Sequence, residues 1–375
     1  MFLKTPPMGY NTWNTFGENI DEELIMETAD AMVNEGLLDA GYQYLVIDDC
    51  WSEYDRDPKT ERLVPDHKKF PHGMKYVADY VHSKGLKFGM YSCAGVRTCA
   101  DYPGSYDHEY LDAETFAEWG VDYLKYDNCF VPGMTASPFL YRRMGMALRS
   151  CGRDIVFSAC NWGLDDVWSW ARAAGADLYR STGDVCDNFN SYYEIACSQI
   201  SKFGSNAPGC FNDMDMMTVG MYGKGNVGSS GCNDREYRTQ FALWCLFGTP
   251  LMLGCDVRHM TPETKALVTN KELIRINQDP ECRGPLRVCQ EYAANNVFMR
   301  HLAGNEIALL FLNPRDSACP ARAHACEIGL TVNSGYHLEA TELFTGEKLR
   351  QEKDYFSICL EPHECSIYRG KIVKD

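Results

Sequence analysis

The sequence predicts an α/β protein, a (β/α)8 TIM barrel followed by a small C-terminal antiparallel β-sandwich domain. Two observations carry this prediction. From the N-terminus to about residue 280, short apolar runs alternate with longer amphipathic stretches, which is typical of βα units. After Pro285 the pattern changes to short alternating runs separated by Gly, Asn and Pro, which indicates antiparallel strands. We therefore expect a catalytic barrel over residues 1–282 and a β domain over residues 283–375.

The individual elements follow from the same periodicities. The expected barrel strands cover residues 8–13, 42–47, 86–91, 122–126, 154–159, 178–181, 209–212 and 250–254. The expected helices cover residues 74–84, 113–119, 141–149, 165–173, 192–202 and 235–247. Asn233-Asp234 before the last helix and Gly85 after the first support those boundaries. A doubly wound open sheet would also alternate, but the number of βα units over this length favours a closed barrel. The expected C-terminal strands cover residues 297–301, 306–312, 337–341 and 365–368.

Composition limits the function classes. The 375-residue chain carries a formal charge of −16 with its basic residues scattered, so its field disfavours nucleic acid and anionic membranes. It contains no apolar run of membrane-spanning length and no signal-peptide pattern, so a cytoplasmic location is expected. The 18 cysteines lack zinc-site spacing, so we expect no metal and mostly reduced, buried thiols.

Several expected strands end in carboxylates. Because strand C-termini converge on one face of a barrel, these acids can meet around one ligand: Asp48, Asp49, Asp127, Asp184, Asp215 and Asp256. Any single Asp could instead be a turn former or a helix N-cap. Other polar and aromatic residues lie near the same strand ends: Lys125, Arg180, Tyr91, Trp13, Trp51, Trp162 and Phe211. Aromatic faces beside carboxylates suit a sugar, although Phe211 fits core packing better.

Glycoside cleavage needs a carboxylic acid to protonate the leaving oxygen and a carboxylate to act at the anomeric carbon. Lys125 lies two residues before Asp127, so the two side chains share one face of their strand. A neighbouring cation is expected to keep Asp127 ionised, as a nucleophile requires.

The sequence also resembles a known family, glycoside hydrolase family 27, which contains α-galactosidases and α-N-acetylgalactosaminidases. The matching motifs are Pro7-Met-Gly-Tyr-Asn-Thr-Trp13, Ile47-Asp-Asp-Cys-Trp51, Gly89-Met-Tyr91, Tyr123-Leu-Lys-Tyr-Asp-Asn-Cys129 and Asn212-Asp-Met-Asp-Met216. The resemblance implies a retaining double displacement with Asp127 as nucleophile and Asp184 as acid/base. It implies no cofactor, and it implies a substrate with a terminal α-galactoside.

The resemblance also implies the binding residues. Asp48 and Asp49 match the pair that binds the 4- and 6-hydroxyls of galactose, and further matches are Trp13, Tyr91, Cys99, Lys125, Arg180 and Asp215. Asn161 stands where α-galactosidases usually carry a glutamate facing the 2-hydroxyl, and it can still donate and accept hydrogen bonds. Leu164 keeps bulk where relatives specific for N-acetylgalactosamine carry a smaller residue, so galactose is preferred.

Two cysteine predictions come from the same resemblance. Cys99 and Cys129 match a family disulfide, whose formation here depends on the redox compartment. Cys50 matches another disulfide position whose partner is absent from this sequence, so we predict a free thiol.

Rival hypotheses remain at this level. The strand-end acids could hold Mg²⁺ or a similar hard cation in a metal-dependent barrel enzyme, although Lys125 among the ligands argues against it. The chain could also be an inactive carbohydrate-binding barrel. Within the family, α-N-acetylgalactosaminidase and β-L-arabinopyranosidase activities are the alternatives, and a homo-oligomer is left open.

Overall fold

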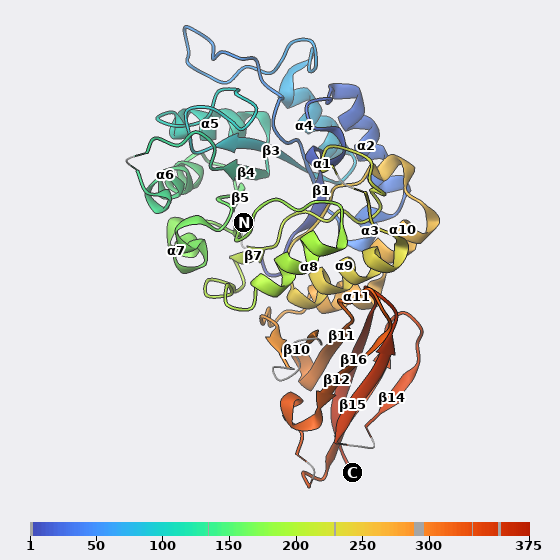
Figure 1. Ribbon diagram of the computed structural model, residues 1–375. Helices are drawn as coiled ribbons and strands as arrows, with labels where there is room; N and C mark the ends of the chain where they lie inside the picture. Colours follow the sequence, from blue (N-terminus) through green and yellow to red (C-terminus); the bar gives the residue numbers. More distant parts are fainter. Residues whose placement is uncertain (1–2, 134, 229, 289–295, 332, 352–353) are drawn as a thin grey trace.

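The larger part of the computed structural model is a parallel barrel surrounded by helices (Figure 1). The structure describes residues 3–133, 135–228, 230–288, 296–331, 333–351 and 354–375. The barrel region contains β1 (Met8–Asn11), α1 (Trp13–Phe16), α2 (Glu22–Asn34), α3 (Leu37–Ala40), β2 (Tyr44–Val46), α4 (Gly73–Ser83), β3 (Lys87–Cys93), α5 (Glu109–Trp119), β4 (Tyr123–Asp127), α6 (Ser137–Ser150), β5 (Val156–Ala159), the 3-10 helix η1 (Leu164–Asp166), α7 (Val167–Ala174), β6 (Leu178–Arg180), α8 (Phe189–Ser198), β7 (Phe211–Asp213), α9 (Asp234–Phe247), β8 (Leu251–Leu253), η2 (Val257–His259), α10 (Pro262–Val268) and α11 (Lys271–Asn277).

The sheet follows chain order and closes on itself. Its strands pair as β7-β6-β5-β4-β3-β2-β1-β8, all in parallel. Closure comes from a parallel bridge between Met217, just after β7, and Leu253 of β8. The Met217 amide donates to the Met252 carbonyl at 2.8 Å, and the Gly254 amide donates to Met217 at 3.2 Å. The predicted TIM-barrel fold is therefore confirmed, with all strand C-termini on one face.

The remaining chain forms the C-terminal β domain. It contains β9 (Leu286–Arg287), β10 (Asn296–Leu302), η3 (Ala303–Asn305), β11 (Glu306–Leu312), β12 (Cys319–His324), η4 (Ala325–Ile328), β13 (Tyr336–Glu342), β14 (Lys348–Arg350), β15 (Tyr355–Leu360) and β16 (Cys365–Lys374). A six-stranded sheet, β14-β13-β16-β11-β10-β9, faces the two-stranded β12-β15 sheet across a small apolar core. The expected boundary after residue 282 falls between α11 and β9.

Strand β11 shows why this domain packs firmly on the barrel. Side chains alternate with period two along a strand, so its two faces enter two different cores. Ile307, Leu309 and Phe311 enter the core of the β domain, whereas Ala308, Leu310 and Leu312 join the main barrel core. The strand is therefore buried on both faces, which explains why its sequence is a nearly continuous apolar run.

Arg300 also connects the β domain to the barrel. Arg300 of β10 is 1% exposed, and its guanidinium donates to the carbonyl of Ile276 at 2.9 Å and to that of Leu246 at 3.4 Å. Helix C-termini leave carbonyls without partners inside the helix, so Arg300 satisfies the ends of α9 and α11 from the β domain. No helix of the described chain is long and apolar enough to cross a membrane.

Several helices were not predicted from the sequence. No helix was expected between the first two strands, where α2 lies, or after the eighth strand, where α10 and α11 lie. Helix α2 begins at the N-cap Asp21, whose carboxylate accepts from the Leu24 amide, and buries Leu24, Ile25, Thr28, Ala29 and Met32. The cap and the i, i+3, i+4 spacing of its apolar residues were both readable in the sequence.

Candidate active site

A cavity of about 310 Å³ opens at the C-terminal ends of the barrel strands. It is lined by Trp13, Asn14, Asp48, Asp49, Tyr91, Cys99, Lys125, Asp127, Trp162, Arg180, Asp184, Val185, Cys186, Asp215, Met216, Asn226, Val227 and Gly228. The structure thus brings together most of the predicted site residues, from loops and strand ends that are far apart in the sequence. This is the face on which TIM-barrel enzymes carry their active sites.

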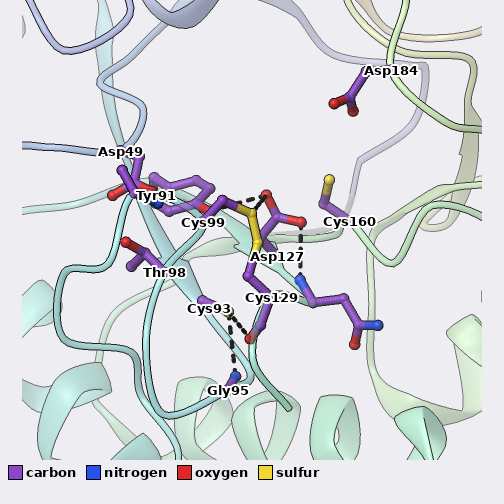
Figure 2. Close-up of a disulfide and its surroundings, with 12 residues drawn as sticks. Asp49, Tyr91, Cys93, Gly95, Thr98, Cys99, Asp127, Cys129, Cys160 and Asp184 are labelled. Carbon is purple, nitrogen blue, oxygen red and sulfur yellow. Dashed lines mark hydrogen bonds between the residues drawn. A yellow bond between two sulfur atoms is a disulfide. The ribbon is translucent and has the colours of Figure 1, made fainter.

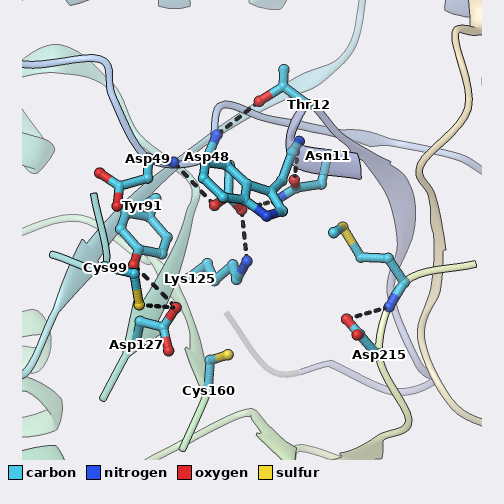
Figure 3. Close-up of polar contacts among 12 residues, drawn as sticks. Asn11, Thr12, Asp48, Asp49, Tyr91, Cys99, Lys125, Asp127, Cys160 and Asp215 are labelled. Atoms are coloured by element: carbon cyan, nitrogen blue, oxygen red, sulfur yellow. Dashed lines mark hydrogen bonds and ion pairs between the residues drawn. The ribbon is translucent and has the colours of Figure 1, made fainter. Parts of the chain in front are cut away.

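Asp48 and Lys125 form a buried ion pair in the cavity wall. The Lys125 ammonium donates to Asp48 Oδ2 at 2.7 Å, and Asn11 Nδ2 donates to the same oxygen at 2.7 Å. Asp48 Oδ1 accepts from the Asp49 amide at 3.0 Å. Figure 3 shows Lys125 pointing toward Asp48. The Asp48 carboxylate is therefore held in one orientation by a cation and two neutral donors.

Asp127 receives only neutral hydrogen bonds. The Tyr91 hydroxyl donates to its Oδ2 at 3.0 Å, and the Asn128 amide donates to its Oδ1 at 2.9 Å. Burial raises the pKa of Asp127, and the charge of Lys125 opposes that rise only in part. Lys125 therefore favours the ionised form of Asp127, in the direction expected, but burial has the larger effect on the pKa of Asp127. The ammonium is engaged by Asp48, and the burial of Asp127 outweighs its charge at longer range.

Arg180 links two further carboxylates. Its Nη2 lies 2.6 Å from Asp184 Oδ1 and 2.9 Å from Asp215 Oδ2. Asp215 is buried, whereas the Asp184 side chain is 81% exposed and stands over the open cavity. Burial would raise the pKa of Asp184, yet the neighbouring Arg180 guanidinium holds it below its ordinary value. Asp184 is thus the accessible carboxyl of the pocket.

Asp49 is tied to the loop that carries the disulfide. Its Oδ2 accepts from the Ala100 amide at 3.0 Å, and burial raises the pKa of Asp49 to about 6. Cys99 is bonded to Cys129, so the bridge joins the loop after β3 to the residues that follow Asp127. Figure 2 shows the bridge alongside Asp127. Cys50 is a buried free thiol, as predicted.

Three predicted pocket residues lie elsewhere. Asn161 is fully buried, and its amide donates to the Leu164 carbonyl at 2.9 Å, so it closes its own loop instead of facing the cavity. Leu164 is 49% exposed on η1 and is not among the lining residues. Asp256 pairs with Arg258 at 2.9 Å and caps η2. The structure therefore does not place these three side chains in the cavity lining. Asn161 bonds to its own loop and Asp256 bonds to a local cation, whereas Leu164 lies on η1 outside the lining.

Trp162, and not the neighbouring Asn161, is the residue of this loop that lines the cavity. It lines the cavity with a backbone φ of 60°, in the left-handed region that is unfavourable for a bulky residue. The following Gly163 is needed because a Cβ there would lie 2.6 Å from the Ser181 carbonyl oxygen. Residues with such unfavourable backbone angles are concentrated at functional sites, and here this conformation places Trp162 in the cavity lining. The sequence indicated an aromatic residue near this strand end, but it did not indicate where the Trp162 side chain points.

Part of the lining was missed altogether. Asn226, Val227 and Gly228 come from the long segment between β7 and α9, and Asn14 comes from α1. The Asn226 amide donates to the Asn14 carbonyl at 2.6 Å, which holds this segment against the barrel mouth. No periodic pattern marks such loop residues, so only the fold reveals them.

The metal hypothesis finds little support in the donor geometry. Among the described residues, the single group with metal-ligand spacing is Cys99, Asp127 and Cys129, and its two sulfurs are bonded to each other. Three of the strand-end acids, Asp48, Asp184 and Asp215, pair with Lys125 or Arg180. Carboxylates engaged by cations are poor ligands for a hard metal ion.

A TIM barrel whose strand-end carboxylates and aromatic side chains surround one cavity fits a glycoside hydrolase. Comparisons with known proteins agree. Residues 5–279 match the family model described as Alpha galactosidase A, and the chain belongs to this α-galactosidase family of glycosidases. It is 42% identical to the α-galactosidase of Cyamopsis tetragonoloba, over 97% of this chain and 86% of that one. It is also 42% identical to the α-galactosidase of Coffea arabica, over 97% and 93% of the two chains. The crystal structure of α-galactosidase I from Mortierella vinacea superposes with a TM-score of 0.91 at 35% identity, covering 98% of this chain and 97% of that one.

Proposed function

We propose that the protein releases terminal α-linked galactose from oligosaccharides or glycoconjugates, with Asp127 as the nucleophile and Asp184 as the acid/base. The observation that carries this assignment is that one cavity presents both carboxyls, a buried one at the end of β4 and an exposed one after β6. The similarity to α-galactosidases over nearly the whole chain supports the choice of sugar.

The chemistry follows from these positions. Protonated Asp184 gives its proton to the glycosidic oxygen while an Asp127 oxygen attacks C1, so the C1–O bond to the leaving group breaks as the glycosyl ester forms. Water then attacks C1, Asp184 takes a proton from that water, and the ester bond to Asp127 breaks. The product keeps the anomeric configuration of the substrate because two inversions have occurred.

The remaining carboxylates bind the sugar. Asp48, fixed by Lys125 and Asn11, and Asp49, fixed by the Ala100 amide, are oriented to accept hydrogen bonds from hydroxyls of the bound ring. Trp13 and Trp162 supply apolar faces for the carbons of that ring.

The test of the reaction is stereochemical. A time course of hydrolysis of an aryl α-galactoside, followed by proton NMR, should show α-galactose before any β anomer. Asp127→Asn should abolish turnover, and Asp127→Gly with azide should form a β-galactosyl azide. First appearance of the β anomer from wild type, or full activity of Asp127→Asn, would refute the proposed mechanism.

The sugar is tested separately. The para-nitrophenyl glycosides of α-galactose, α-N-acetylgalactosamine and β-L-arabinopyranose should be compared side by side, with and without EDTA. We expect the galactoside to have the highest kcat/KM and EDTA to leave it unchanged. A preference for either other sugar would reassign the substrate, and loss of activity with EDTA would restore the metal hypothesis.

A further inference from the structure

Next to the 310 Å³ cavity, called the sugar pocket below, the barrel contains a much smaller cavity of about 20 Å³, and the two share Lys125, Arg180 and Asp215 in their linings. It is lined by Asn11, Tyr123, Lys125, Ser158, Cys160, Arg180, Asp213, Asp215, Met216 and Met252. A polar space of this size holds one water molecule when the water finds at least two hydrogen-bonding partners.

Arg180 lines both cavities and has one donor without a partner. Its Nη2 contacts Asp184 and Asp215, and its Nη1 lies 3.5 Å from Cys160 Sγ, whereas its buried Nε has no partner within the described protein. The residue is only 3% exposed, so an Nε–H group without an acceptor is unfavourable there.

Asp213 offers the complementary acceptor. It lies at the end of β7, in register with Arg180 of β6, and one carboxylate oxygen, Oδ1, accepts from the Asp215 amide at 2.9 Å. Its side chain lines the small cavity, and it lines no part of the sugar pocket. It therefore can act on the reaction only through its neighbours.

We propose that Asp213 is a positioning residue, which holds Arg180 through one water in the small cavity and so places the Asp184 carboxyl for protonation of the leaving group. The water accepts from Arg180 Nε–H and donates to the free oxygen of Asp213. Arg180 is then fixed at all of its nitrogens, and its Nη2 keeps Asp184 at 2.6 Å over the open cavity. The inference rests on the proposed role of Asp184.

The test separates positioning of the acid from general damage by using leaving groups. A dinitrophenyl leaving group departs with little help from a proton, whereas a sugar alkoxide needs one. The ratio of kcat/KM for an α-galactosyl oligosaccharide to kcat/KM for 2,4-dinitrophenyl α-galactoside therefore reports on the acid. Since general acid catalysis contributes roughly 10²–10⁴-fold, Asp213→Asn should lower this ratio at least about tenfold.

A matched control comes from the opposite end of the barrel. Asp177 precedes β6, accepts from the Phe157 amide at 2.9 Å and, like Asp213, has its pKa raised by burial to about 6. Asp177→Asn removes the same kind of buried carboxylate without touching Arg180, so its ratio should stay that of wild type. An equal loss for both substrates in Asp213→Asn, or no loss, would overturn the proposal.

Two further variants keep the result unambiguous. Ser158→Thr places a methyl group in the small cavity without changing any charge, so displacement of the water should lower the ratio even where Asp213→Asn does not fold. An unchanged ratio in a folded Ser158→Thr would count against the water. Asp184→Ala should lower the ratio most of all. If it does not, the proposed role of Asp184 fails, whereas failure of the Asp213 and Ser158 variants alone rejects only this inference.

Discussion

Replacement of Lys125 by methionine tests how the pocket supports its carboxylates. Methionine keeps most of the apolar stem and removes the ammonium that contacts Asp48 at 2.7 Å. The Asp48 side chain is 3% exposed and that of Lys125 is 14% exposed, so the pair is largely shielded from water. The variant therefore leaves a carboxylate in the barrel without its cation.

The expected loss of stability is about 3 kcal/mol. Removal of one partner of a buried pair typically costs about 3–5 kcal/mol. The lower end applies because Asp48 keeps hydrogen bonds from Asn11 at 2.7 Å and from the Asp49 amide at 3.0 Å. At roughly 2 °C per kcal/mol, the melting temperature should fall by about 6 °C near neutral pH.

Melting by differential scanning calorimetry near neutral pH measures this effect. The double variant Lys125→Met/Asp48→Asn serves as the control, because it removes the stranded charge and should recover most of the lost stability without recovering activity. A double variant no more stable than Lys125→Met would show that Lys125 contributes through packing and not through its charge.

The remaining predictions concern pH and stability. Asp127 has a raised pKa from burial, and Asp184 has one lowered by Arg180, so the reactive form, with Asp127 ionised and Asp184 protonated, is a minority of the free enzyme. The variant Asp184→Ala should therefore be assayed with an activated aryl galactoside. Its kcat/KM should show only an acid limb, which reports ionisation of Asp127 and should lie near the alkaline limb of wild type. Coincidence with the wild-type acid limb would refute the inference that Asp127 has the higher pKa of the two. Arg300→Met leaves carbonyls at two helix ends without their donor. It should destabilise the protein by roughly 3–5 kcal/mol in chemical denaturation. A loss under about 1 kcal/mol would contradict this role of Arg300. Asn233→Ala removes the capping box of α9 and should cost about 1 kcal/mol in the same assay, whereas no loss would show the cap to be dispensable.

The sequence was most informative where side chains project from regular strands. Asp127 and Lys125 were placed together because both lie on β4, whose period of two is read directly from the sequence. The prediction that Asn161 faces the cavity failed for the opposite reason. It lies in a loop with left-handed residues at Trp162 and Gly163, and periodicity says nothing about which way such a loop turns its side chains. The fold was thus predictable to the level of the barrel, and the site to the level of strand ends.

Electrostatic roles were harder to predict because they depend on which partner a charge finds. The spacing of Lys125 and Asp127 was right, but the ammonium is engaged by Asp48, a residue on a different strand. A single sequence gives neighbours along a strand and leaves neighbours across the barrel undetermined. The distribution of charge in the pocket therefore had to come from the structure.

That distribution gives each carboxyl a different task. The two pocket cations, Lys125 and Arg180, make their direct contacts with carboxylates that bind or protonate. Within the described part of the chain Asp127 has only uncharged partners, the hydroxyl of Tyr91, a backbone amide and the Cys99 sulfur at 3.8 Å. A carboxylate neutralised by a direct salt bridge would be a weaker nucleophile, because its charge would already be compensated. In this pocket the charge on Asp127 stays available to the positive charge that develops at the anomeric carbon, the one place where its stabilisation grows on the way to the transition state.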